Sequence, residues 1–140
     1  MEQANAIELK NITKRFGEVV ANDSVDLSVK HGEILSVLGE NGSGKTTLMN
    51  MISGIYFPDE GQIFVDGEEV SICSPKDSFA LGIGMIHQHF KLVDVLTAAE
   101  NIILGLEGKS VLDMKKVVQD IQEVTERYGF ELDPLSLIHI

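Results

Sequence analysis

Residues Gly39–Thr47 read GENGSGKTT, and the first eight follow the spacing G-x-x-x-x-G-K-[ST]. The glycines can adopt backbone angles that are unfavourable for other residues, and they present bare N–H groups to phosphate oxygens. Lys45 can reach β- and γ-phosphates, and the Thr46 hydroxyl is suited to ligate Mg²⁺. The segment predicts a triphosphate site formed by Gly39, Glu40, Asn41, Gly42, Ser43, Gly44, Lys45, Thr46 and Thr47.

The residues on either side of this loop favour a phosphate site over an ordinary glycine-rich turn. Glu33–Leu38 (EILSVL) is a nearly continuous apolar run, typical of a strand buried on both faces. Thr46–Ile52 has helical composition, and Gly54 is a plausible end of that helix. Such a helix directs its positive N-terminal end at the phosphates.

Composition limits the classes of protein to which the chain can belong. Acidic residues number 22 and basic residues 11, a formal net charge of -11 that argues against nucleic acid and against direct lipid binding. The single cysteine, Cys73, excludes an internal disulfide and a zinc site. No apolar stretch approaches the roughly 18 residues of a membrane-spanning helix. Met1–Ala6 lacks the pattern of a signal peptide, so we expect a soluble, intracellular chain.

Strands and helices are predicted on both sides of the loop. Alternating or apolar runs predict strands over Ile7–Phe16, Ser24–Val29, Gly61–Val65 and Ile83–His87, with turns at His31-Gly32 and Asp66-Gly67. Capping patterns predict helices over Pro75–Leu81, after Ser74, and over Thr97–Leu104, with Glu100 completing a capping box. A third helix is predicted over Asp113–Tyr128, with one apolar face made of Met114, Val117, Val118, Ile121, Val124 and Tyr128.

Other proteins with such a loop fit the sequence less well. GTPases usually carry D-x-x-G and N-K-x-D elements, and neither is present here. Small-molecule kinases usually place the loop almost at the N-terminus, whereas 38 residues precede Gly39.

The layout resembles the ATP-binding subunit of ABC transporters over residues 6–134. Two stretches carry the resemblance beside the loop, ITKRFGEVVAND (Ile12–Asp23) and GMIHQHFKLVDVLTAAENIILG (Gly84–Gly105). The first implies that Phe16 stacks on adenine, although the family more often has Tyr there. The second implies that Gln88, 43 residues after Lys45, contacts Mg²⁺ or the attacking water and relays nucleotide state to the transmembrane subunit.

Plainer interpretations of these residues remain open. Phe16 can be a core residue, and Gln88 can be a surface residue at the end of a strand. His87 and His89 flank Gln88, but alternate positions at a strand end are more often solvated than paired on a metal.

The resemblance implies an α/β P-loop NTPase fold of the ABC type. We expect an antiparallel β subdomain, a partial RecA-like parallel core and the start of a helical subdomain. Its cofactors would be ATP and Mg²⁺, the latter held by Thr46 and Gln88. Its partners would be transmembrane permease subunits, a second ATPase domain and, indirectly, a periplasmic or lipoprotein substrate-binding protein. It would be cytoplasmic, on the inner face of the plasma membrane through the permease.

The sequence pattern HQHF-LVD-LT-AEN-ILG most resembles that of ATPases of bacterial nucleoside and simple-sugar importers. In those proteins one chain usually carries two ATPase halves, and the resemblance implies that this is the first half. The sequence contains no L-S-G-G-Q segment and no apolar strand ending in Asp-Glu after Gln88. No catalytic general base is therefore identified, and we expect the chain to bind nucleotide without hydrolysing it. Two alternatives are a non-hydrolysing nucleotide-binding module and a soluble ABC ATPase without a membrane partner.

The last six residues, Leu135–Ile140, read LSLIHI and no longer resemble the family. These are the residues that the DNA CTG TCT CTT ATA CAC ATC would encode, and that DNA resembles a transposon end used in preparing sequencing libraries. We therefore expect a partial ATPase domain over residues 6–134 and a non-native tail over 135–140. A natural apolar C-terminus is the alternative.

Overall fold

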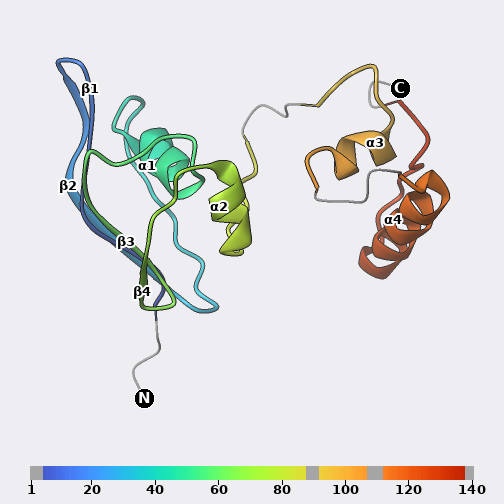
Figure 1. Ribbon diagram of the computed structural model, residues 1–140, viewed down its shortest axis with the longest axis horizontal. Coiled ribbons are helices and arrows are strands. Elements are labelled where there is room, and N and C mark those ends of the chain that lie inside the picture. The colour runs from blue at the N-terminus through green and yellow to red at the C-terminus, as the bar shows by residue number, and fades with distance from the viewer. Residues whose placement is uncertain (1–4, 88–91, 107–111, 138–140) are drawn as a thin grey trace. The chain divides into compact units, whose positions relative to one another are not determined.

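A computed structural model describes residues 5–87, 92–106 and 112–137. The chain forms two compact units, Met1–Met85 and Ile86–Ile140 (Figure 1). No helix in the described part of the chain is both long and apolar enough to span a membrane.

The first unit is built on a four-stranded antiparallel sheet with the order β2-β1-β3-β4. Its strands are β1 (Asn5–Phe16), β2 (Val19–Lys30), β3 (Glu60–Val65) and β4 (Glu68–Val70). Three of the five strands predicted from the sequence are confirmed as β1, β2 and β3. The second of them, β2, starts earlier than predicted because it pairs with β1 as far as the hairpin turn. The turn at Asp66-Gly67 is also confirmed, since both residues have positive φ, as a tight hairpin turn requires.

Two helices cover one side of this sheet, α1 (Lys45–Ile52) and α2 (Pro75–Ala80) (Figure 1). Ser74 caps α2 by accepting a hydrogen bond from the backbone of Asp77, as its pattern predicted. Between the sheet and α1 lies an apolar core whose buried members are Leu9, Ile12, Leu48, Met51, Ile63 and Ile72. This core fixes α1, and therefore the loop before it, against the sheet.

A bulge in β1 explains why its apolar residues do not alternate strictly. Leu9 pairs with Leu27 and Ile12 pairs with Val25, so β1 has one more residue than β2 over this interval. Asn11 takes up the extra length with φ 51°, and its N–H donates to Asp26 Oδ1 at 2.7 Å. As a result Leu9 and Ile12, three residues apart, both reach the core.

Two predicted strands are wrong as regular elements. Residues 33–40 and 83–87 have no regular secondary structure, and Ile34, Leu38 and Ile86 are at least 90% exposed. A strand requires a neighbour with which its backbone can exchange hydrogen bonds. All strands in the described part of the chain belong to the antiparallel sheet, and none of them pairs with either segment.

The second unit contains the two helices predicted in this region, α3 (Ala98–Ile103) from its capping pattern and α4 (Met114–Tyr128) from its apolar face. Thr97 and Glu100 form the complete capping box of α3. Asp113 caps the N-terminus of α4, and Gly129 ends it in the left-handed conformation. Residues after α4 return to α3, because the carbonyls of Ser136 and Pro134 accept hydrogen bonds from Ala98 and Ala99.

The buried face of α4 differs in part from the predicted one. Ile121 is buried as expected, and Thr125 is buried as well. Val124 and Tyr128 are 54% and 63% exposed. The six residues of α3 span about 9 Å and the 15 of α4 about 22 Å, so α3 covers only part of α4.

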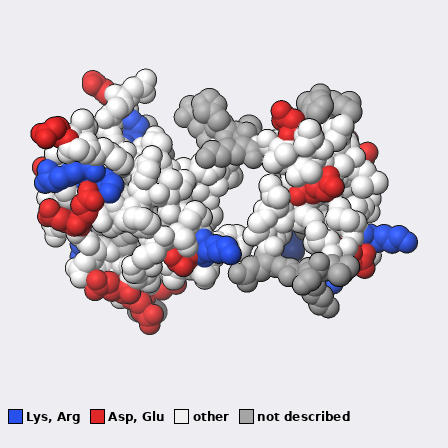
Figure 2. Space-filling view, turned by 45° about the horizontal axis from the view of Figure 1, so that its top comes forward, with Lys and Arg blue, Asp and Glu red and all other residues white. Residues whose placement is uncertain are grey.

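Charged groups of the first unit form local pairs. Figure 2 shows one face of the molecule, on which several Lys and Arg side chains lie next to Asp and Glu side chains. Lys10 pairs with Glu8 at 3.3 Å, and Lys14 pairs with Asp59 at 2.9 Å. Each of these lysines therefore has a carboxylate partner close to it.

The bulge generates a test of the sheet. Gly61 has φ +100°, and a Cβ there would lie 2.5 Å from the carbonyl oxygen of Asn11 and 2.6 Å from that of Lys10. Gly67 also has positive φ (+82°), but a Cβ there would meet nothing within 4 Å. We predict that Gly61→Ala lowers the free energy of unfolding by about 1–3 kcal/mol more than Gly67→Ala, as measured by urea denaturation. Equal losses would contradict this packing.

Candidate functional site

The phosphate-loop residues lie between the irregular segment 33–40 and α1. Gly42 and Gly44 adopt φ 87° and φ 83°, in the left-handed region that glycine tolerates best. Glu40 accepts a backbone hydrogen bond from Ser43 at 3.2 Å, which closes a turn, and Asn41 is exposed. Gly42 and Gly44 therefore have the backbone conformation for which the loop glycines were singled out, whereas Gly39 does not have a positive φ.

Lys45 lies at the centre of the loop. Its ammonium donates to the carbonyl oxygens of Gly39 and Glu40, each at 2.7 Å, and to Ser43 Oγ at 3.1 Å. The loop thus curls around a single positive charge at the first residue of α1. Oxygen atoms of an anionic ligand can replace these neutral acceptors, and hydrogen bonds between charged groups are the stronger ones.

The first turn of α1 suits an anion with a divalent cation. It contains no acidic residue, so no side chain in this turn opposes the positive end of the helix. Thr46 is exposed and Thr47 is half-buried. The Thr46 hydroxyl is a hard oxygen donor that fits Mg²⁺ bound mostly by water and phosphate.

Gly44 brings the loop into contact with the sheet. A Cβ at this position would collide with the carbonyl oxygen of Ala21 on β2 and would lie 2.9 Å from Asn22 Nδ2. Only glycine fits here, both because of its φ and because the strand approaches so closely. Asn22 lies in the stretch Ile12–Asp23 that carries the family resemblance, but nothing in the sequence indicated that it contacts the loop.

Phe16 lies at the end of β1 and is 43% exposed, so it is not a plain core residue. Its ring meets that of Tyr56 edge to face, with centroids 5.2 Å apart and planes at 72°. Lys14 Nζ lies 5.4 Å from the Phe16 centroid. Tyr56 was missed by sequence reasoning, because it lies 40 residues away and only the fold brings it to Phe16.

The strand register relates Phe16 to the loop. Lys14 pairs with Asn22, which contacts Gly44, and Phe16 pairs with Val19 at the hairpin turn. Phe16 therefore lies two residues, or about 7 Å, farther along β1 than the level of this contact. The hairpin that carries Phe16 thus also contacts the phosphate-type loop, at Gly44.

Asp59 anchors the end of β1 that carries Phe16. Its carboxylate accepts from Lys14 Nζ at 2.9 Å and from the N–H of Arg15 at 2.6 Å, and its own N–H donates to the Thr13 carbonyl at 2.8 Å. The hydrogen bond from Lys14, followed by that from Arg15, holds the pKa of Asp59 below its ordinary value.

The second metal ligand proposed from the sequence, Gln88, lies outside the described residues, as does His89. His87 is half-buried in a segment without regular structure. Within the described ranges, no group of three or more His, Cys, Asp or Glu side chains is placed to hold a metal ion.

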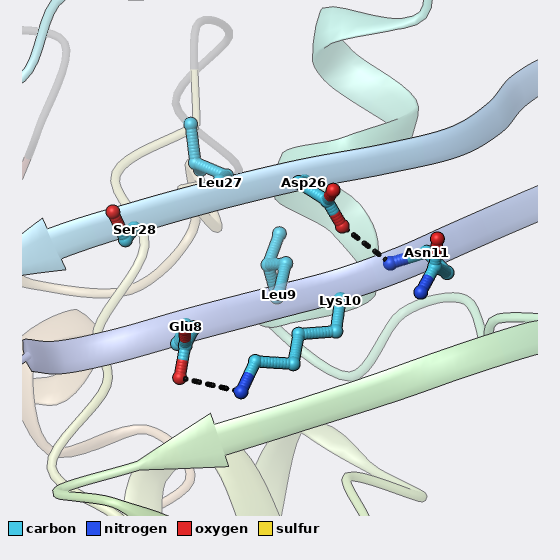
Figure 3. Close-up of a pocket in the computed structure, with 7 residues that line it drawn as sticks. All are labelled: Glu8, Leu9, Lys10, Asn11, Asp26, Leu27 and Ser28. Carbon is cyan, nitrogen blue, oxygen red and sulfur yellow. Dashed lines mark hydrogen bonds and ion pairs between the residues drawn. The ribbon is translucent and has the colours of Figure 1, made fainter.

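A separate pocket of about 360 Å³ lies over the bulge between β1 and β2 (Figure 3). Two polar contacts lie within the pocket. Asp26 accepts from the N–H of Asn11, and Lys10 pairs with Glu8. These contacts stabilise the bulge, and the pocket does not include the loop or Phe16.

Comparisons with known proteins show which family this sequence matches. The family model described as "ABC transporter" matches residues 22–137. The chain is 53% identical to the guanosine import ATP-binding protein NupO of Bacillus subtilis, over 91% of this chain and 26% of that protein. It is 51% identical to the nucleoside import ATP-binding protein NupA of Lactococcus lactis, over 99% and 28%. It is 46% identical to the ribose import ATP-binding protein RbsA 1 of Streptomyces avermitilis, over 94% and 26%.

Solved structures show the same fold. MJ1267, an ATP-binding cassette of an ABC transporter, superposes with a TM-score of 0.74 at 28% identity, over 87% of this chain and 53% of that one. MJ0796, a dimeric bacterial ABC transporter cassette, gives a TM-score of 0.73 at 29% identity, over 94% and 60%. The chain spans about a quarter of the length of the relatives named above.

The Asp59 contacts generate a pH-dependent prediction. Because folding lowers the pKa of this carboxyl, its stabilising contribution is present above the unfolded value, near 3.8, and is lost as the pH falls through the lower folded value. We predict that Asp59→Asn lowers the melting temperature at pH 7, and that its difference from the wild type shrinks as the pH falls below about 4.

Thermal melts between pH 7 and pH 3, followed by circular dichroism, measure this difference. Glu18→Gln is the matched control, since it removes a hairpin carboxylate that makes no hydrogen bond to the described residues. A difference for Asp59→Asn that stays constant with pH would rule out the anchoring role of its charge.

Proposed function

Because this chain belongs to the ABC transporter ATP-binding family, we propose that Gly39–Thr47 binds the phosphates of ATP and that Phe16 stacks on its adenine. The observation that carries the proposal is the position of Lys45, whose ammonium is surrounded by three loop oxygens at the start of α1. The fold of the ABC cassettes and the similarity to import ATP-binding proteins support it.

Each part of the proposed site has a distinct role. Lys45 exchanges its contacts with loop oxygens for contacts with the β- and γ-phosphates. Backbone N–H groups of the loop and the N-terminus of α1 bind the remaining phosphate charge. Mg²⁺, held by Thr46 and Gln88, would neutralise phosphate charge. Phe16, supported at its edge by Tyr56, provides the surface for the base.

In the longer protein we propose that ATP binding and hydrolysis drive import of a nucleoside or a simple sugar. The similarity to guanosine, nucleoside and ribose import proteins supports this substrate class. The partners would be transmembrane permease subunits, a second ATPase domain and, indirectly, a substrate-binding protein. Through the permease the protein would lie on the cytoplasmic face of the membrane. The 140 residues contain no LSGGQ segment, so for them we propose binding without turnover.

We also propose that the partial ATPase domain comprises residues 6–134 and that 135–140 is a non-native tail. The six residues LSLIHI support this proposal, because a transposon end used in preparing sequencing libraries would encode them when translated. Sequencing the gene beyond codon 134 from independent reads tests it, because a natural gene that encodes the same six residues there would contradict it.

The phosphate contacts are tested with Lys45→Ala, which removes the positive charge from the loop. We predict that this variant loses ATP binding in calorimetry, because a charge-assisted hydrogen bond contributes about 1.5–3 kcal/mol and Lys45 can make several. Lys76→Ala, which removes a lysine of α2 outside the site, is the control and should retain the wild-type affinity. Unchanged affinity in Lys45→Ala would show that the loop is not the phosphate site.

The base contact is tested with Phe16→Leu and Phe16→Tyr. Stacking of a base on an aromatic ring contributes about 1–3 kcal/mol, so Phe16→Leu should raise the Kd for ATP at least about fivefold. Phe16→Tyr keeps the ring and should bind like the wild type. Inorganic tripolyphosphate, which has no base, should bind both variants equally. A parallel loss of ATP and tripolyphosphate affinity in Phe16→Leu would contradict stacking.

A further inference from the structure

Asn22 is a polar side chain in the interior of the first unit. It lies on β2 and is only 7% exposed. Its Nδ2 donates to the carbonyl oxygen of Gly44 at 3.4 Å, whereas its buried Oδ1 has no hydrogen-bond partner among the described residues. A buried acceptor without a partner costs stability, so an apolar residue of similar size would serve a purely structural role better.

The partner of Asn22 is the residue on which the phosphate loop turns into α1. Gly44 is the N-cap of α1, and its carbonyl also accepts the first helical hydrogen bond, from Leu48 at 2.9 Å. The N-cap makes no side-chain hydrogen bond of its own, as expected of glycine. Asn22 is therefore the side chain that ties this end of the helix to the sheet.

The same strand is paired with the strand that carries Phe16. Asn22 pairs with Lys14 across the hairpin, and Phe16 follows two residues later. The contact with Gly44 therefore connects the segment proposed to bind the base with the segment proposed to bind the phosphates. Lys45 follows Gly44 directly, so the position of Lys45 depends on that of Gly44.

We propose that Asn22 is a positioning residue of the nucleotide site, which fixes Gly44 and the first turn of α1 relative to the hairpin that carries Phe16. The inference rests on the proposed ATP site and adds a residue outside the phosphate loop to it. Asn22 acts through Gly44 and does not touch the nucleotide.

Asn22→Leu tests the proposal because it separates affinity from stability. Leucine has a similar volume and removes the unpaired acceptor, while the Gly44 carbonyl keeps its bond from Leu48. We predict that the melting temperature of the 140-residue chain is unchanged or higher, and that the Kd for ATP with Mg²⁺ rises about three- to tenfold. Unchanged affinity would refute the proposal.

Thr13→Val provides the matched control in the same hairpin. Thr13 is 2% exposed, and its Oγ1 accepts from the N–H of Ser24 at 2.9 Å, away from the loop. This variant should melt at a lower temperature and bind ATP with the wild-type Kd. If both variants lose affinity in proportion to stability, Asn22 has only a structural role. If Lys45→Ala also binds ATP normally, the site itself is wrong, which is a different result from unchanged affinity in Asn22→Leu alone.

A measurement on the wild-type chain covers the case in which Asn22→Leu does not fold. The side-chain amide resonances of Asn22 should shift when ATP and Mg²⁺ are added, because the Gly44 carbonyl that it contacts adjoins Lys45. Asn101 is the internal reference, since its amide donates to the carbonyls of Val93, Leu96 and Thr97 in the other unit. Asn22 resonances that do not move on saturation with ATP would overturn the proposal.

Discussion

The close approach of β2 to Gly44 is the constraint on which the first unit depends. The strand backbone leaves no space for a Cβ, and the left-handed φ of 83° excludes most other residues independently. Any larger residue would have to push α1 away from the sheet. Because Leu48 and Met51 on α1 are part of the buried core, that movement would open the core as well. The same close contact at Gly44 is therefore needed both to pack the core and to place the phosphate loop.

Irregularities in the sheet set the geometry at this point. The bulge at Asn11 lets Leu9 and Ile12 both face the core, and a second irregularity at Ser24, with φ 49°, precedes the pairing of Lys14 with Asn22. At this second irregularity the N–H of Ser24 donates a hydrogen bond to a side chain, Thr13 Oγ1. Bulges increase strand twist, so the bulge at Asn11 alters the direction of the hairpin that carries Phe16. Asp59 then fixes that end through Lys14 and Arg15.

The features predicted correctly from sequence are those that depend on residues close together in the chain. The conformations of Gly42 and Gly44, the caps at Ser74 and Thr97, and the turn at Asp66-Gly67 each depend on a few neighbouring residues. The strand predicted over Glu33–Leu38 failed because its apolar composition says nothing of a pairing partner. Tyr56 and Asn22 were missed for a related reason, since Phe16 and Gly44 are their neighbours only in space. Local chemistry thus predicts the phosphate half of the site, and the sheet register is needed for the rest.

The two halves of the proposed site make different physical demands. Phosphate binding requires concentrated charge and bare backbone N–H groups, which one short loop with Lys45 provides. Base binding requires an exposed aromatic face held at a fixed distance from that charge. Phe16 has an exposed ring, and the hairpin sets its distance from the loop. A ligand that uses both halves gains affinity only if their spacing is already set, because ordering them on binding costs free energy. The polar contact between Asn22 and Gly44 joins the two halves directly, and this accounts for an amide in a place where an apolar side chain would pack as well.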